Sequence, residues 1–317
     1  MSTPAVMVLQ IFIIVSYLYI VCAYSYRLIK YIRMPVHLRW EIYPVPHEKG
    51  SKYGGSYLEE LEWWKKTRTK NTAKDIFYII KDYLFFIQYY ARNRKYWSTL
   101  YPWHISFYLI VAFHVFVAFG ALGLIFGLDV STASSANAGG QALYYIALGL
   151  GIGGFIIGCL ASIGMLINRA TDPDLKKFAN PRLYFSYVFY FAVFLSGLVV
   201  WAVYDPTFAD YREFYKSVAT LHNINLAAPL IIHAVLFALF LVYMTFTKAS
   251  HYVTKFVIFF ATRWNDIPNT RGSKLEQRIQ ERLGHAVNWS APHIQTGEKW
   301  SEVAVESPFI EKKDKKK

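Results

Sequence analysis

The sequence has very little cysteine. Cys22 and Cys159 are the only two among 317 residues, and no CxxC or CxxCH motif occurs. Covalently attached c-type haem, zinc-ribbon sites and cysteine-ligated iron–sulfur clusters are therefore excluded within this chain. Any such group has to belong to a partner protein.

Charge is also scarce, because Asp, Glu, Lys and Arg make up 17% of the chain against 55% hydrophobic residues. Five stretches contain none of these four residue types and are long enough to cross about 30 Å of hydrocarbon as helices. They are residues 5–26, 105–128, 142–167, 183–204 and 226–247. The first stretch has no basic n-region before it, so we expect a retained span. The sequence therefore predicts an all-α integral membrane protein with five transmembrane helices.

The 34 Lys and Arg residues are distributed unevenly between the loops. The loop 31–98 has 13 of them and the segment from Lys248 to the end has another 13, whereas the loop 129–141 has none. The positive-inside rule then places the N-terminus outside and the C-terminus in the cytoplasm, which agrees with an odd number of spans. The net charge of +13 reflects topology and attraction to anionic membrane lipid, and nucleic-acid binding is not expected.

The predicted organisation has four parts. They are a first transmembrane helix (1–30), a cytoplasmic loop (31–98), transmembrane helices 2 to 5 (99–250, with the end of helix 5 reaching about 262) and a cytoplasmic tail (263–317). Apolar and charged residues alternate over 73–97, which predicts an interfacial amphipathic helix inside the loop. Several aromatic residues before it suit either the membrane interface or a protein docking surface.

Four of the nine histidines lie at membrane depth. His104 and His114 are ten residues or about 15 Å apart on the second span, and His233 and His251 are eighteen residues or about 27 Å apart on the fifth. Because these spans run in opposite directions, His104 and His251 lie toward the cytoplasmic face, and His114 and His233 toward the outer face. Two facing imidazoles can supply both axial ligands of a haem iron.

Histidines and glycines inside spans also have roles that involve no cofactor. An intramembrane histidine can be a neutral imidazole that hydrogen-bonds between helices, and the glycines of the second and third spans suit helix packing as well as a porphyrin face. His222 is an alternative ligand to His233, a quinone-binding residue together with Asn223, or an exposed loop residue. The remaining histidines lack the close spacing of a zinc site: His37, His47, His285 and His293.

The two histidine spacings, ten residues on helix 2 and eighteen on helix 5, are also those of a known family. The chain resembles the gamma (cytochrome b) subunit of membrane-bound respiratory nitrate reductase and its relatives in the Hmc, Tmc and Dsr redox complexes of sulfate reducers. The resemblance covers about 100–250. The loop 31–98, with "MPVHLRWEIYPVPHE" and "GGSYLEELEWW", is similar to the sulfate-reducer branch.

The resemblance implies a bacterial or archaeal cytoplasmic (inner) membrane protein with two haem b groups between helices 2 and 5. It assigns His104 and His251 to the inner haem and His114 and His233 to the outer haem. The implied function is respiratory electron transport between a cytoplasmic iron–sulfur subunit related to heterodisulfide reductase and either a menaquinone pool or a periplasmic multihaem cytochrome c.

Two further functions stay open on the sequence alone. A structural membrane anchor without haem would use the same histidines only as bridges between helices. A transporter or channel would ordinarily show charged residues along a path or interrupted helices in matching halves, and the sequence shows neither. Because no predicted span contains a carboxylate, a proton-conducting path through the chain is not expected.

Overall fold

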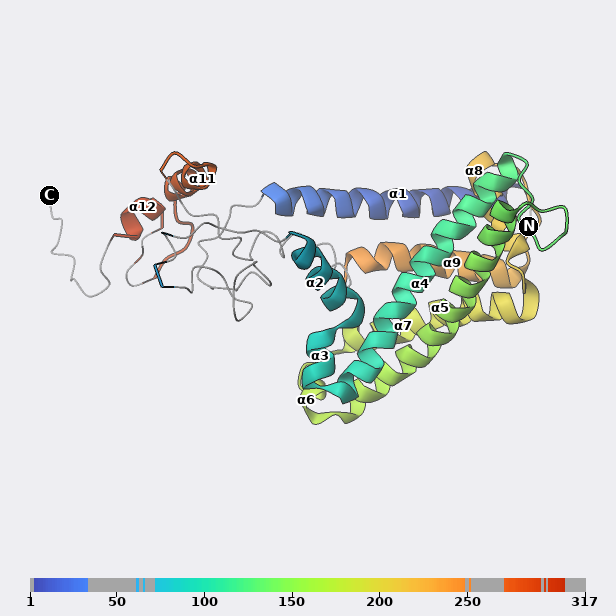
Figure 1. The fold of residues 1–317 in the computed structure, drawn as a ribbon, viewed down its shortest axis with the longest axis horizontal. Coiled ribbons are helices and arrows are strands. Elements are labelled where there is room, and N and C mark those ends of the chain that lie inside the picture. The colour runs from blue at the N-terminus through green and yellow to red at the C-terminus, as the bar shows by residue number, and fades with distance from the viewer. Residues whose placement is uncertain are drawn as a thin grey trace. The chain divides into compact units, whose positions relative to one another are not determined.

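The computed structural model describes residues 3–33, 61–62, 65, 72–248, 251, 271–291, 294 and 296–305. Five of its helices are long and apolar enough to cross a membrane, which confirms the predicted number (Figure 1). They are α1 (Thr3–Arg33), α4 (Arg94–Ile125), α5 (Ala138–Thr171), α7 (Pro181–Val199) with the π-helical turn η3 (Val200–Tyr204), and α9 (Ala228–Thr245). The described residues form no β-strand, so the fold class is all-α.

The long helices begin at caps that the sequence encodes. Asn93, Asn137 and Asn180 precede α4, α5 and α7, and each side chain accepts a hydrogen bond from a backbone N–H of the first turn. Pro181 lies in the first turn of α7, where its missing N–H leaves no bond unmade. Because its cap is at Asn93, α4 begins well before the apolar run that starts at residue 105.

Glycines allow the helices of the bundle to approach closely. A Cβ on Gly154 of α5 would lie 3.3 Å from the backbone nitrogen of Ile110 on α4. The ring of Phe155 on α5 lies over Gly197 of α7, where an added Cβ would overlap it. These glycines therefore serve helix packing, which is one of the two uses considered for them.

α9 ends at Thr245, whereas the fifth helix was expected to reach about residue 262. The N–H groups of Phe246 and Thr247 bond to carbonyls three residues back, which tightens the last turn. The Arg182 guanidinium donates a hydrogen bond to the Phe246 carbonyl, an acceptor that a continuing helix would need. Residues 252–262 lie outside the described part of the chain.

The predicted interfacial helix forms as two short helices, α2 (Thr72–Phe85) and α3 (Ile87–Arg92). Phe77, Ile80 and Leu84 are exposed at spacings of three and four residues, so they lie on one face of α2. An apolar face of this kind is what an interfacial helix needs. Between the two helices, Phe86 adopts a left-handed conformation with φ 49°.

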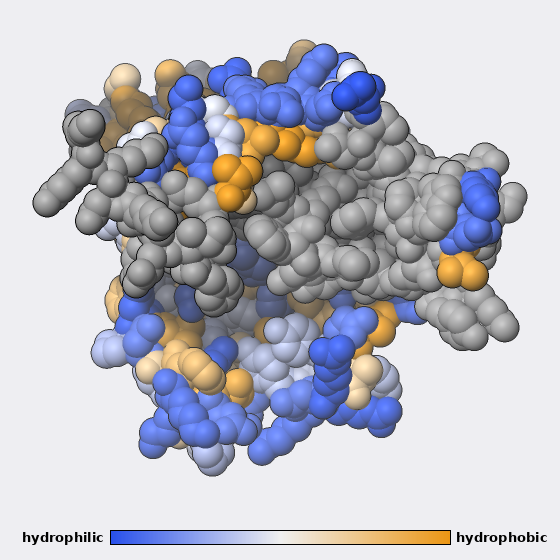
Figure 2. Space-filling view, turned by 90° about the vertical axis from the view of Figure 1, so that its left-hand side faces the viewer, coloured by the Kyte–Doolittle hydropathy of each residue, from blue (hydrophilic) through white to orange (hydrophobic). Residues whose placement is uncertain are grey.

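Basic residues gather at the end of the bundle where α5 finishes and α7 begins. The connection between these helices contains α6 (Pro173–Lys176) and carries Arg169, Lys176, Lys177 and Arg182. Figure 2 looks at the molecule from this side, and its lower part shows many hydrophilic side chains with apolar ones between them. Four basic residues thus lie at this end of the helical bundle.

The connection from η3 to α9 contains a further helix, α8 (Ala209–Thr220), where the sequence suggested only a loop. Asp205 fixes its start, because its carboxylate accepts hydrogen bonds from the N–H groups of Ala209 at 2.8 Å and Tyr211 at 2.9 Å. α8 packs against α4 and lies at the end of the bundle where α1 begins (Figure 1).

The predicted cytoplasmic tail contains a small folded segment. α11 (Lys274–Leu283) and α12 (Trp300–Val303) lie at either end of a turn that is closed by backbone bridges between Ala286 and Lys299 and between Ala291 and Ile294. Val287, Ile294 and Val303 form its buried core. The tail is therefore more than a polar extension.

Candidate functional site

His114 and His233 face one another inside the bundle. His114 comes from the middle of α4 and His233 from the second turn of α9, and their side chains are 4% and 0% exposed. Their ring centroids lie 6.3 Å apart, with 31° between the ring planes. The structure therefore brings together the two histidines that were predicted to share the outer depth.

His104 and His251 form a second facing pair. Their ring centroids lie 6.0 Å apart, with 81° between the planes. His251 follows the turn after Thr245, so the expectation that it shares one continuous helix with His233 is wrong. The turn nevertheless brings it back opposite α4. The two pairs are ten residues, or about 15 Å, apart along that helix.

Three of the four imidazoles are oriented by backbone carbonyls through Nδ1. A carbonyl oxygen can only accept, so Nδ1 carries a proton in each of these three rings. The three Nδ1-to-carbonyl distances are 2.8 Å from His104 to Leu100, 2.7 Å from His114 to Ile110 and 2.7 Å from His251 to Lys248. A backbone carbonyl bonded to Nδ1 in this way fixes the orientation of the ring, as it does in metal-ligating histidines.

The fourth imidazole, His233, also carries a proton on Nδ1, and here the acceptor is a serine oxygen. Its Nδ1 lies 2.8 Å from Ser196 Oγ. The Ser196 hydroxyl already donates to the Val193 carbonyl at 2.8 Å, so its oxygen accepts from His233. The Nε2 atom of His233 is buried and has no hydrogen-bond partner among the described residues. A buried nitrogen left in this state is costly and calls for a ligand.

The Nε2 atom of His114 has a protein partner. It accepts a hydrogen bond of 3.0 Å from the Tyr211 hydroxyl of α8. The ring of Phe237 stacks on the His114 ring with 3.6 Å between centroids and 5° between planes. Side chains from α8 and α9 thus occupy the space next to this imidazole.

Phe86 packs against His104 of the other pair. Its side chain is buried, and its ring centroid lies 4.4 Å from that of His104. Phe86 holds this position with a positive φ, which is unfavourable for a residue with a large side chain. Backbone strain of this kind is found where surrounding structure demands one side-chain placement.

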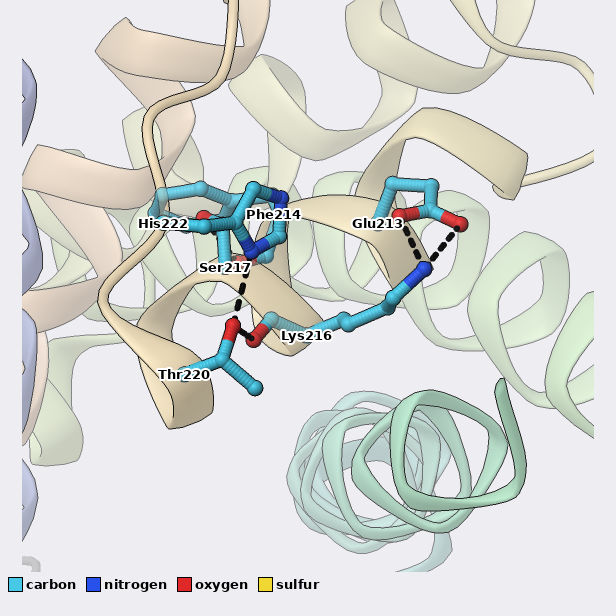
Figure 3. A network of polar contacts seen from close by, with 6 residues as sticks. All are labelled: Glu213, Phe214, Lys216, Ser217, Thr220 and His222. Carbon is cyan, nitrogen blue, oxygen red and sulfur yellow. Dashed lines mark hydrogen bonds and ion pairs between the residues drawn. The ribbon is translucent and has the colours of Figure 1, made fainter. Parts of the chain in front are cut away.

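His222 and Asn223 are exposed and stand apart from both pairs. The Nδ1 atom of His222 lies 2.7 Å from Thr220 Oγ1 in the polar network at the end of α8 (Figure 3). The His222 carbonyl accepts a hydrogen bond from Gln10 of α1. Among the described residues no second imidazole faces His222, so the geometry favours His233 as the partner of His114.

The described residues contain no group of three or more His, Cys, Asp or Glu side chains that could hold a metal ion. Facing pairs of histidine are a different kind of site, because an axial haem site needs only two protein ligands. Three of the histidines for which no zinc site was expected lie outside the described part of the chain: His37, His47 and His293.

Sequence reasoning missed α8, whose Tyr211 reaches His114, and two buried charged residues on and just before this helix. Asp205 and Arg212 are 4% and 3% exposed. Burial raises the pKa of the Asp205 carboxyl above its ordinary value and lowers the pKa of the Arg212 guanidinium. Apolar residues at 211, 214, 215 and 218 have the spacing of a helix face and were a signal for α8.

The five apolar helices and the all-α fold define the class of this molecule as a multi-pass membrane protein. Comparisons of the chain with protein-family models, with curated proteins and with solved structures give no match. The function is therefore argued from the two histidine pairs themselves.

Proposed function

We propose that this protein is a dihaem b-type cytochrome, the membrane subunit of a respiratory redox complex. His114 and His233 hold the outer haem, and His104 and His251 hold the inner haem. The observation that carries the proposal is that four imidazoles on two antiparallel segments face each other in two pairs, each with its Nδ1 atom hydrogen-bonded to a protein oxygen.

The distances fit the proposed ligand. Two imidazoles that bind one iron from opposite sides, through bonds of about 2 Å each, have ring centroids roughly 6 Å apart. The two pairs have centroid separations of 6.3 Å and 6.0 Å. The buried, unpartnered Nε2 of His233 is the donor atom such a site requires. Room for a porphyrin at the outer pair requires Phe237 and Tyr211 to move aside.

When bound, haem b supplies one-electron oxidation and reduction. The chain contributes orientation, spacing and exclusion of water. Leu100, Ile110 and Ser196 fix the directions of three ligand rings, and the buried aromatic side chains around His114 and His233 keep the outer pair dry. The separation of about 15 Å along α4 sets the length of the electron path between the pairs.

The charge distribution supports an orientation with the basic loop and tail in the cytoplasm of a bacterium or archaeon. The inner pair then faces a cytoplasmic iron–sulfur subunit, which is needed because the chain itself has no cysteine motif for a cluster. At the outer face, electrons are exchanged with menaquinone or with a periplasmic multihaem cytochrome c. Charge separation arises from electrons crossing the membrane, since the spans contain no carboxylate.

A structural anchor without haem is the second candidate. The bond from Tyr211 to His114 and the stacking of Phe237 favour it, because both satisfy His114 without a ligand. They do not satisfy the Nε2 atom of His233. A transporter has no comparable support among the described residues.

The test is the optical spectrum of the full chain purified from membranes. We expect reduced-minus-oxidised b-type bands and about two haems per chain. His114→Ala and His233→Ala should each remove one haem and spare the other, and His222→Ala should remove none. Colourless, folded protein would falsify the proposal. Loss of a haem from His222→Ala but not from His233→Ala would overturn the assignment of the outer ligands.

A further inference from the structure

Arg212 is a buried cation with an unused donor. Its side chain is 3% exposed, and its Nη1 atom has no hydrogen-bond partner among the described residues. The stem packs on α4 so closely that a Cβ on Gly120 would lie 2.8 Å from Arg212 Cδ. The guanidinium carbon lies 5.4 Å from the centroid of the Tyr144 ring on α5. A buried guanidinium without an anion is among the costliest arrangements in a protein.

Among the described residues, no carboxylate forms an ion pair with Arg212. Asp205 attracts the guanidinium at longer range, but its two oxygens accept hydrogen bonds from the N–H groups of Ala209 and Tyr211. Asp129 is bonded to Ser135 and has an exposed environment. The charge of Arg212 is therefore only partly compensated, and the position of Nη1 calls for an anionic oxygen from another molecule.

The stem of Arg212 packs on α4 in the part of the helix that follows His114. Tyr211, the residue before Arg212, donates its hydroxyl to His114 Nε2. The stem of Arg212 packs against Gly120. Gly120 follows His114 by six residues on α4, or about 9 Å along the axis. Haem b carries two carboxylates on the edge of its ring, so its anionic groups lie several ångströms from the iron. His114 on α4 thus offers an imidazole for an iron, and Arg212 of α8 offers a guanidinium for a carboxylate about 9 Å further along the axis of α4.

We propose that Arg212 binds a carboxylate of the haem held by His114 and His233. The inference rests on the proposed function and adds a second, charge-based contact to it. A guanidinium–carboxylate bond in a dry site is strong and directional. Arg212 therefore fixes the orientation of the ring around the axis that joins the two imidazoles, a choice that the axial bonds alone leave open.

The test compares haem b with haem dimethyl ester, in which both carboxylates are blocked. Both are titrated into the ligand-free, detergent-solubilised full chain carrying His104→Ala, so that only the outer pair binds. We expect esterification to weaken binding by about tenfold or more in this chain, and by less than about twofold when Arg212→Met is added. Arg212→Lys should lie between the two.

Lys216→Met is the matched control, because it removes a cation from the same helix that is already paired with Glu213. It should leave the effect of esterification unchanged. Equal weakening by the ester in the chains with and without Arg212→Met would overturn the inference. If Arg212→Met does not fold, the same comparison of haem b with its dimethyl ester in the Arg212→Lys chain tests the inference. Failure of the His104→Ala chain to bind either compound would refute the proposed function instead.

Discussion

The rings of Phe237 and His114 are almost parallel and 3.6 Å apart, so the aromatic side chain lies beside the line that joins His114 to His233. A porphyrin lies across such a line. Under the proposed function, haem binding at the outer pair would therefore be an exchange, in which the ring of Phe237 leaves and the haem takes its place.

Phe237→Ala tests this exchange. Loss of the ring should destabilise the ligand-free chain by about 3–5 kcal/mol through the cavity it leaves. Added haem should fill the same space, so the difference in Tm between variant and parent should shrink when haem is bound. The measurement is thermal unfolding with and without haem. A difference that stays constant while haem binds would contradict the exchange.

Tyr211→Phe removes one hydroxyl and keeps the ring. Because that hydroxyl competes with iron for His114 Nε2, the variant should bind haem at the outer pair about fivefold more tightly, as expected for one neutral hydrogen bond. Haem titration in the His104→Ala background measures this. Tyr215→Phe is the control, since the Tyr215 hydroxyl bonds to Tyr17 rather than to a histidine. Weaker binding in Tyr211→Phe would show that the hydroxyl supports the site.

Phe86 combines a strained backbone with a ring that covers His104. Phe86→Gly loses the ring and relieves the strain, whereas Phe86→Ala loses the ring and keeps the strain. The glycine variant should therefore be more stable than the alanine variant by about 1 kcal/mol. Thermal unfolding of the two variants gives the comparison. If alanine proves the more stable, the left-handed conformation of residue 86 is not present in solution.

Gly197→Ala should destabilise the bundle. The new Cβ would overlap the ring of Phe155 on α5, which has to shift inside a packed interior, at a cost of about 1–3 kcal/mol. Gly149→Ala is the matched control, because a Cβ there meets no atom within 4 Å. Unfolding by heat in a mild detergent separates the two variants. Equal stability of both would mean that α5 and α7 are further apart than described.

The raised pKa of the Asp205 carboxyl predicts that the stability of the protein depends on pH. Burial raises the pKa of its carboxyl, while N–H groups of Tyr211 and Ala209 lower it, Asp210 raises it and Arg212 lowers it. A carboxyl with a raised folded pKa contributes stability that is fully present below its unfolded pKa of about 3.9 and lost as the pH rises through the folded value. The Tm of Asp205→Asn relative to the parent should therefore increase as the pH rises above about 4. A pH-independent difference would refute this assignment.

Features that depend on short stretches of chain could be predicted from the sequence. The apolar runs determine the number of spans because burial in a bilayer is a property of each run by itself. The spacing of His104 and His114, with that of His233 and His251, was enough to pair them by depth. The structure places both pairs face to face.

Features that depend on contacts between residues far apart in the chain could not be predicted from the sequence. α9 ends where it does partly because Arg182, 64 residues earlier in the chain, bonds to the Phe246 carbonyl. The contact of Tyr211 with His114 joins residues 97 positions apart. The burial of Arg212 depends on Gly120 having no side chain. Such contacts follow from how the helices pack, which a single sequence does not reveal.

The tautomers of the two outer imidazoles have a consequence for the energetics of ligand uptake. Both rings hold Nδ1 as a donor, while Nε2 of His114 accepts from Tyr211 and Nε2 of His233 has no partner among the described residues, so neither ring has to release a proton to solvent when a metal arrives. The heat of haem uptake at the outer pair should then be the same in phosphate and in Tris, whose ionisation enthalpies differ greatly.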